Sequence, residues 1–88
     1  MLQELRKSID VCDDEIAKSF IKRMKTVSEI AAYKRKNNLQ TFDAAREKEL
    51  KERILQSTDE NMRDYMGELF DKILELSKKY QGNLTKNS

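Results

Sequence analysis

Residues 2–36 read LQELRKSIDVCDDEIAKSFIKRMKTVSEIAAYKRK, a stretch without glycine or proline. Along it, one set of positions recurs at steps of three and four, which is typical of one face of an α-helix. The set comprises Leu2, Leu5, Ile9, Cys12, Ile16, Phe20, Arg23, Val27, Ile30 and Lys34. This stripe predicts one unbroken helix from about Leu2 to about Lys36. Asn37 and Asn38 provide a stop, because asparagine tolerates the left-handed conformation that ends helices.

The length of this helix favours a dimer. About 35 residues at ~1.5 Å each make a rod of roughly 52 Å. A compact monomer of this size has a radius of gyration of about 12 Å, hence a diameter near 30 Å. Because the stripe continues along the whole rod, a second chain has to cover part of it, and two paired long helices are the simplest solution. The alternative is a helix broken in its middle, for which the sequence offers no glycine or proline.

Two further helices complete a predicted all-α fold. One is expected from near Asp43 to near Gln56. A capping box at residues 57–60, with Ser57 and Glu60 three apart, predicts the start of the other. Gly82 lies where a C-terminal cap is expected, so residues 82–88 are predicted to be a frayed tail. The apolar positions of the last helix are Met62, Met66, Leu69, Phe70, Ile73 and Leu74. Residues 1–88 therefore form one predicted domain.

Composition excludes several classes of function. The chain has 88 residues, a formal charge of +2, one cysteine and no histidine. This charge is too small to predict binding to nucleic acid or a membrane. Without histidine, a His-based general base, a histidine zinc site and a Cys–His pair are excluded. Cys12 lies on the stripe and is expected to be a small buried apolar residue. The chain has no apolar leader or membrane span, so a cytoplasmic protein is expected.

Polar residues interrupt the apolar stripe of each predicted helix. Arg23 and Lys34 lie within about 40° of Val27 and Ile30 around the first helix. The second helix carries Asp43, Arg46 and Glu47 in line with Leu50, and the third continues from Ile73 into Ser77 and Gln81. Taken singly, Asp43, Arg46 and Glu47 could form an ordinary charged helix start, and the long side chains of Arg23 and Lys34 could extend to water. Together they predict a buried polar pocket, since such groups need partners or a ligand.

The cations of this set predict an anionic ligand. Guanidinium groups suit carboxylates because they form paired hydrogen bonds. Arg6 lies about 100° around the helix from Arg23 and some 25 Å along it, too far to share its pocket. An antiparallel partner chain would instead supply Arg6. The predicted ligand is a small anion held by arginines of two chains.

The segments LRKSID, IKRMKTVSEIAAYKRKNN, FDAAREKELKERI and LFDKILELSKKYQ resemble the all-helical chorismate mutases. The resemblance spans Leu2 to Gln81. Its most specific part is the Asp-x-x-Arg-Glu pattern of Asp43, Arg46 and Glu47, nine residues beyond Lys34.

The resemblance implies an intertwined homodimer of three-helix chains that converts chorismate to prephenate in the biosynthesis of phenylalanine and tyrosine. It implies catalytic roles for Lys34 and Gln81, at the ether oxygen, and for Glu47, at the ring hydroxyl. It implies substrate-binding roles for Arg6 (from the partner chain), Arg23, Asp43, Arg46 and Ser77. An intramolecular rearrangement requires no metal and no cofactor.

Two alternatives stay open. An isochorismate pyruvate lyase of the same fold needs a similar pocket. A non-catalytic helical dimerisation module would carry the same charges as a solvated face. A further alternative is that this is one domain of a larger polypeptide, because the family that the chain resembles is often fused to other enzymes of the aromatic pathway.

Overall fold

The computed structural model describes residues 1–86 and consists of helices joined by short segments. Its elements are α1 (Leu2–Lys36), α2 (Ala44–Gln56), the short 3-10 helix η1 (Glu60–Met62) and α3 (Arg63–Lys86). No strand occurs within these 86 residues. The predicted all-α fold of three helices, the first very long, is confirmed.

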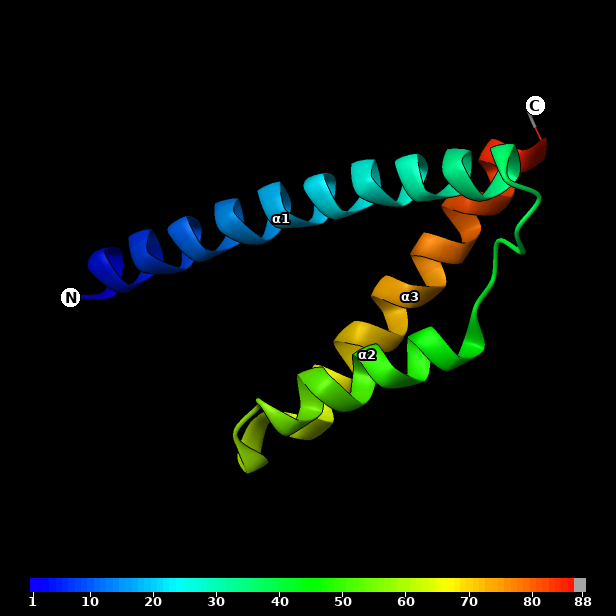
Figure 1. Ribbon diagram of the computed structural model, residues 1–88. Coiled ribbons are helices and arrows are strands. Elements are labelled where there is room, and N and C mark those ends of the chain that lie inside the picture. Colours follow the sequence, from blue (N-terminus) through cyan, green and yellow to red (C-terminus); the bar gives the residue numbers. More distant parts are fainter. Residues whose placement is uncertain (87–88) are drawn as a thin grey trace.

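Both ends of the first connection follow from local chemistry. α1 ends where predicted, and Asn38 adopts the left-handed conformation with φ 58°. α2 begins after Asp43, whose Oδ1 accepts a hydrogen bond from the backbone N–H of Arg46 at 3.0 Å. This bond satisfies one of the N–H groups that the first turn of a helix leaves without a partner. The segment 37–43 between these two stops reverses the direction of the chain before α2 (Figure 1).

The predicted capping box at residues 57–60 is wrong. The hydroxyls of Ser57 and Thr58 both donate to the backbone oxygen of Ile54, at 3.0 and 2.6 Å, so they close α2. The next element is η1, which begins after Asp59 without a side-chain cap. A hydroxyl just after a helix can donate to the last carbonyls of that helix or accept from the first N–H groups of the next one. Here both hydroxyls donate to the preceding helix.

The predicted stop at Gly82 is also wrong. α3 passes through Gly82 and continues to Lys86, the last described residue, with no described glycine in the left-handed region. An interior glycine weakens a helix only by about 0.5–1 kcal/mol, which the surrounding turns can offset. Residues 82–86 are therefore helical, and the last two residues of the predicted tail lie outside the described part.

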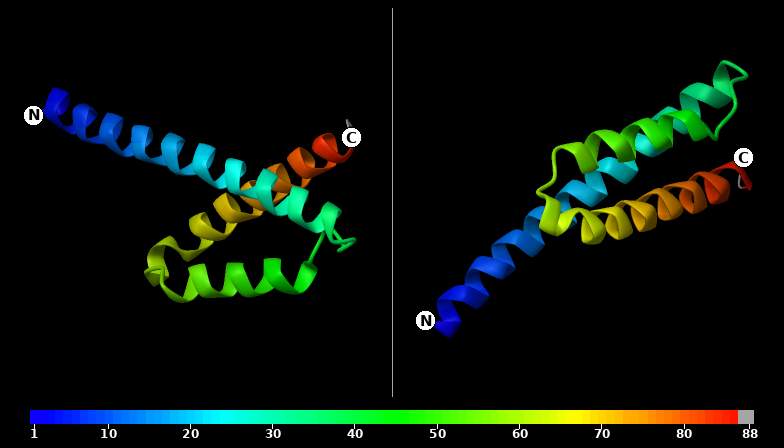
Figure 2. Two further views of the ribbon diagram at one scale, coloured as in Figure 1. Left: turned by 45° about the horizontal axis from the view of Figure 1, so that its top comes forward. Right: turned by 90° about the horizontal axis from the view of Figure 1, so that it is seen from below.

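The helices form an open arrangement. α3 packs against both α1 and α2, whereas α1 and α2 do not pack against each other in the described residues. Figure 1 shows α1 and α3 meeting near their C-terminal ends and diverging toward the N-terminus of α1. The two further views agree that the first half of α1 extends beyond the other helices (Figure 2). The molecule measures 54 × 26 × 15 Å, and its radius of gyration is 16.0 Å.

The buried core of the chain is small. Only Val27, Ala31 and Leu74 are buried apolar residues, and Ser77 is the one buried polar residue among those described. Apolar side chains of α1 such as Leu5, Ile9 and Ile16 remain more than half exposed. No described helix is long and apolar enough to cross a membrane.

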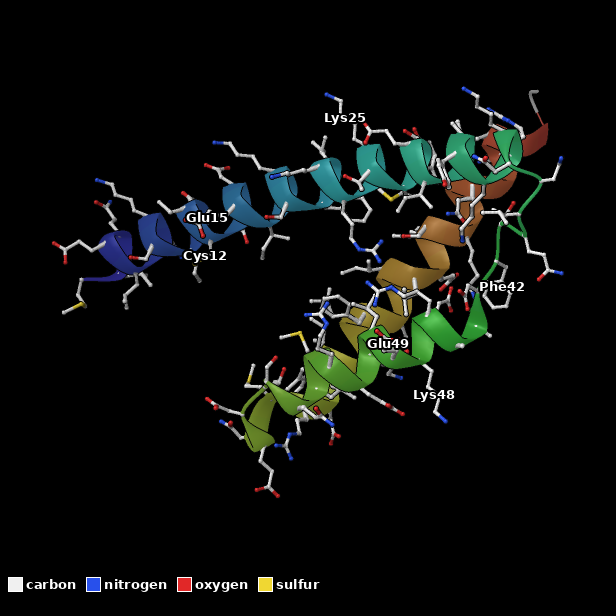
Figure 3. The ribbon with its side chains drawn as sticks, in the orientation of Figure 1. Cys12, Glu15, Lys25, Phe42, Lys48 and Glu49 are labelled. Carbon is white, nitrogen blue, oxygen red and sulfur yellow. The ribbon has the colours of Figure 1, made fainter. Side chains whose placement is uncertain are left out.

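An apolar groove lies between the middle of α1 and α3. It has a volume of about 680 Å³, and its apolar lining includes Ile16, Phe20, Leu69, Phe70, Ile73 and Leu76. Cys12 also lines it and is exposed in this chain, so the expectation of a buried cysteine is wrong for the chain alone. In Figure 3, Cys12 and Glu15 lie on the half of α1 that extends beyond the other helices. We call this feature the α1–α3 groove.

Candidate active site

A second pocket lies where α1, α3 and the start of α2 come together, with a volume of about 180 Å³. Seven of the eight predicted site residues line it: Arg23, Lys34, Asp43, Arg46, Glu47, Ser77 and Gln81. Its apolar lining comprises Val27, Ile30, Leu50 and Leu74, together with the ring of Phe42. A single chain therefore brings these residues together without Arg6, and we call this pocket the polar pocket.

Arg23 and Ser77 join α1 to α3 inside the polar pocket. Nη1 of Arg23 donates to Oγ of Ser77 at 2.5 Å. Oγ of Ser77 in turn donates to the backbone oxygen of Ile73 at 2.9 Å, one turn back along α3. Because that carbonyl takes the hydroxyl proton, a lone pair of Ser77 is directed to the guanidinium. The remaining N–H groups of Arg23 are available to a ligand in the pocket.

The electrostatic surroundings of Arg23 favour an anion. Burial lowers the pKa of the Arg23 guanidinium, the nearby charge of Arg46 lowers it further, and Glu47 acts in the opposite direction. The ordinary pKa of arginine is so high that the group stays charged at neutral pH. A cation that has lost part of its hydration and lies near a second cation is stabilised by a bound carboxylate.

Lys34 is held by the segment that follows α1. Its Nζ donates to the backbone oxygen of Thr41 at 3.1 Å. The chain reverses between these two residues, so that the end of α1 and the entry to α2 share one wall of the pocket. An ammonium has three donors, and this bond occupies one of them. Two remain for a ligand.

Asp43 and Arg46 have local roles in the helix start, as the plainer interpretation of these residues holds. Asp43 caps α2, and Nη1 of Arg46 pairs with Oε1 of Glu49 at 3.2 Å on the surface. Glu47 differs from them, because only 25% of its side chain is exposed and its Oε1 lies 3.5 Å from Nζ of Lys78. All three residues line the polar pocket, and Glu47 is the one whose charge is paired with a residue of another helix.

The sequence did not indicate Thr41, Phe42 and Lys78 as pocket residues. Thr41 contributes a backbone oxygen, which no side-chain pattern reveals. Lys78 Nζ lies 4.9 Å from the centre of the Phe42 ring, and its two partners come from other segments. Lys78 follows Ser77 directly, and that adjacency was the one available signal.

Arg6 does not belong to the pocket of its own chain. It lies on the extended half of α1, and its side chain is exposed. At ~1.5 Å per residue, the 17 steps to Arg23 span about 25 Å of helix. Within one chain, Arg6 and Arg23 therefore cannot bind the same small molecule.

The residues present limit the chemistry of the polar pocket. It contains four cationic side chains, Arg23, Lys34, Arg46 and Lys78, and two carboxylates, Asp43 and Glu47. No cluster of three or more potential metal ligands occurs in the described residues. The polar pocket is therefore suited to binding a small polyanion and placing fixed donors against it.

Comparison with known families gives one match. The family model described as "Chorismate mutase type II" matches residues 5–82, which is most of the chain. The matched segment contains all eight predicted site residues. No curated protein and no solved structure matches the chain.

Proposed function

The chain belongs to the chorismate mutase type II family and is an isomerase, and we propose that it converts chorismate to prephenate in the polar pocket, on the route to phenylalanine and tyrosine. The observation that carries this proposal is that one pocket brings together Arg23 and Lys34 of α1, Glu47 of α2 and Ser77 and Gln81 of α3. These are the residue types that a dicarboxylate with an ether oxygen and a ring hydroxyl requires.

The reaction is an intramolecular rearrangement, so the protein has to supply shape and charge. The substrate reacts from a compact conformation that is poorly populated in water, and fixed partners for its carboxylates hold it there. As the carbon–oxygen bond stretches, negative charge gathers on the ether oxygen. Donors fixed at that atom stabilise the transition state more than the ground state. We assign this role to the Lys34 ammonium and the Gln81 amide.

Arg23 and Ser77 are assigned to one carboxylate of the substrate. The hydrogen bond between them fixes the orientation of the guanidinium, so fewer rotamers are lost when the ligand binds. Burial of Arg23 strengthens its attraction for an anion, because less water screens the charge.

The other end of the substrate is assigned to the start of α2. Glu47 accepts a hydrogen bond from the ring hydroxyl, and the backbone at Asp43 provides a further polar contact. Arg46 completes the charged wall. Because Asp43 is fixed by its capping bond to the N–H of Arg46, the backbone at this position is well defined.

We further propose that the enzyme is an intertwined homodimer in which Arg6 binds a carboxylate in the partner's pocket. The small buried core, the exposed apolar side chains of α1 and the α1–α3 groove support this arrangement. A lone chain would leave a large contiguous apolar surface in water, which stable monomers avoid. In an antiparallel pair of α1 helices, Arg6 of one chain comes beside Arg23 of the other.

The test is to incubate the purified protein separately with chorismate and with isochorismate. We expect prephenate from chorismate without any cofactor. Pyruvate release from isochorismate without prephenate formation would instead identify a pyruvate lyase of the same fold. Absence of turnover with both substrates, in a correctly folded dimer, would favour the non-catalytic dimerisation module.

A further inference from the structure

Lys78 stands at the junction of three segments of the polar pocket. It lies on α3, its Nζ is 3.5 Å from Oε1 of Glu47 on α2, and it lies 4.9 Å from the centre of the Phe42 ring in the segment before α2. All three residues line the pocket. Figure 3 shows Phe42 where this segment enters α2.

This contact differs from the other ion pairs of the described chain. Arg46–Glu49 and Lys72–Glu75 join residues three apart on one helix, and both pairs are well exposed. Lys51–Asp71 links α2 to α3, but neither of its residues lines the polar pocket. Lys78–Glu47 is therefore the described ion pair that connects two helices at the site.

Lys78 is the described ion-pair partner of Glu47. Among the described residues, α2 packs against α3 and not against α1, so the pocket wall that carries Glu47 is positioned through α3. A glutamate has three side-chain torsions, and without a partner it samples several rotamers. An ammonium at one carboxylate oxygen restricts that sampling and leaves the other oxygen for a ligand.

Phe42 restricts the ammonium in turn. A cation above an aromatic face is attracted by the electron-rich face of the ring, which is neutral as a whole. Phe42 precedes the capping residue Asp43 and follows Thr41, whose backbone oxygen accepts from Lys34. Contact with Phe42 thus keeps Lys78 at Glu47 and holds the segment that orients Lys34.

We propose that Lys78 is a positioning residue of the substrate pocket, which holds the Glu47 carboxylate and the Phe42 segment in the arrangement that receives the ring hydroxyl of the substrate. This inference rests on the proposed function of the polar pocket. Lys78 acts through Glu47, which binds the substrate equally in the ground state and in the transition state. Its loss therefore weakens substrate binding and leaves the chemical step nearly unchanged.

The test compares Lys78→Met, Lys78→Arg and Lys79→Met by steady-state kinetics with chorismate. Methionine keeps an unbranched stem and a good helix propensity while it removes the charge. Lys79 is the matched control, because it is the adjacent exposed lysine of α3 and does not line the polar pocket. Thermal melting of each variant reports separately on folding.

For Lys78→Met we expect KM to rise about tenfold, with kcat changed less than about twofold. Lys78→Arg restores KM to within about threefold of wild type, since it keeps the charge. Lys79→Met leaves both constants within about twofold. In a Glu47→Gln background the effect of Lys78→Met falls below about twofold, because its partner is already neutral.

Either of two results would overturn the inference. One is a Lys78→Met enzyme with the KM of the wild type. The other is an equal rise in KM on Lys78→Met in the wild-type enzyme and in the Glu47→Gln variant, which would show that Lys78 acts independently of Glu47. A wild-type protein that turns over no chorismate would overturn the proposed function itself, and this inference with it.

Discussion

Arg23 of α1 donates a hydrogen bond from Nη1 to Oγ of Ser77 on α3, 54 positions later in the chain. Ser77 is only 7% exposed, and its own proton is donated to the Ile73 carbonyl. A partly buried cation is thus held at the wall of the polar pocket by an acceptor that has no charge. The arrangement stabilises the position of the guanidinium without neutralising it.

Replacing Arg23 by methionine is expected to separate activity from stability. The lowered pKa of Arg23 means that the folded protein disfavours the protonated form relative to the unfolded chain. At neutral pH its charge therefore opposes folding, so Arg23→Met should leave Tm unchanged or raise it. We expect kcat/KM to fall on the order of 10²-fold or more. A fall in both Tm and activity would assign Arg23 a mainly structural role.

Lys34→Ala tests the assignment of the donor to the ether oxygen. Removing a donor that acts on developing negative charge commonly lowers kcat on the order of 10²-fold or more. Lys25→Ala is the control, because Lys25 is an exposed lysine of the same helix that points away from α2 and α3 (Figure 3). Steady-state kinetics and sedimentation should show a loss of turnover only for Lys34→Ala, with the dimer intact in both variants. Equal activity of the two variants would support the dimerisation module.

The proposed role of Arg6 in the partner's site predicts complementation between two inactive variants. Arg6→Ala and Lys34→Ala homodimers each lack one essential group in both sites. Co-refolding them yields hybrid dimers with one intact site, so about a quarter of wild-type activity is expected at random pairing. If Arg6 served its own chain, each hybrid would carry one defect per site and the mixture would stay inactive.

The proposed dimer interface can be tested with two isoleucines on opposite sides of α1. Ile16 lines the α1–α3 groove and is 62% exposed, whereas Ile21 is 65% exposed and lies about 140° around the helix. Ile16→Asp would bury an unpaired carboxylate between the chains, so it should dissociate the dimer and abolish turnover. Ile21→Asp should leave the sedimentation coefficient and kcat/KM unchanged. Dissociation by both variants, or by neither, would argue against pairing through this groove.

The sequence predicted the full length of α1 better than the local structure at Ser57 and Gly82. The apolar stripe determines α1 because 35 residues without a breaker leave no alternative. Ser57 and Gly82 misled because each residue type is compatible with two local structures. A hydroxyl can serve the helix before it or the helix after it, and a glycine can end a helix or lie within one. Neighbouring turns decide these cases.

The candidate site shows a different limit of prediction from sequence. Arg23, Lys34, Glu47, Ser77 and Gln81 were predicted because each interrupts an apolar stripe on its own helix. Lys78 and Phe42 do not interrupt such a stripe. Their roles depend on the distance between segments that are 36 residues apart in the chain, from residue 42 to residue 78. Periodicity within one helix carries no information about that distance.

The unbroken course of α1 has a consequence for how the chain tolerates insertions and deletions. Arg6 and Arg23 are joined by helix alone, so adding or removing one residue between them turns one arginine by about 100° relative to the other and shifts it by about 1.5 Å. The turn from Asn37 to Gln40 lies outside any helix and can absorb such a change more readily. Variation in chain length should therefore be confined to the turns, and α1 between the two arginines should keep one fixed length.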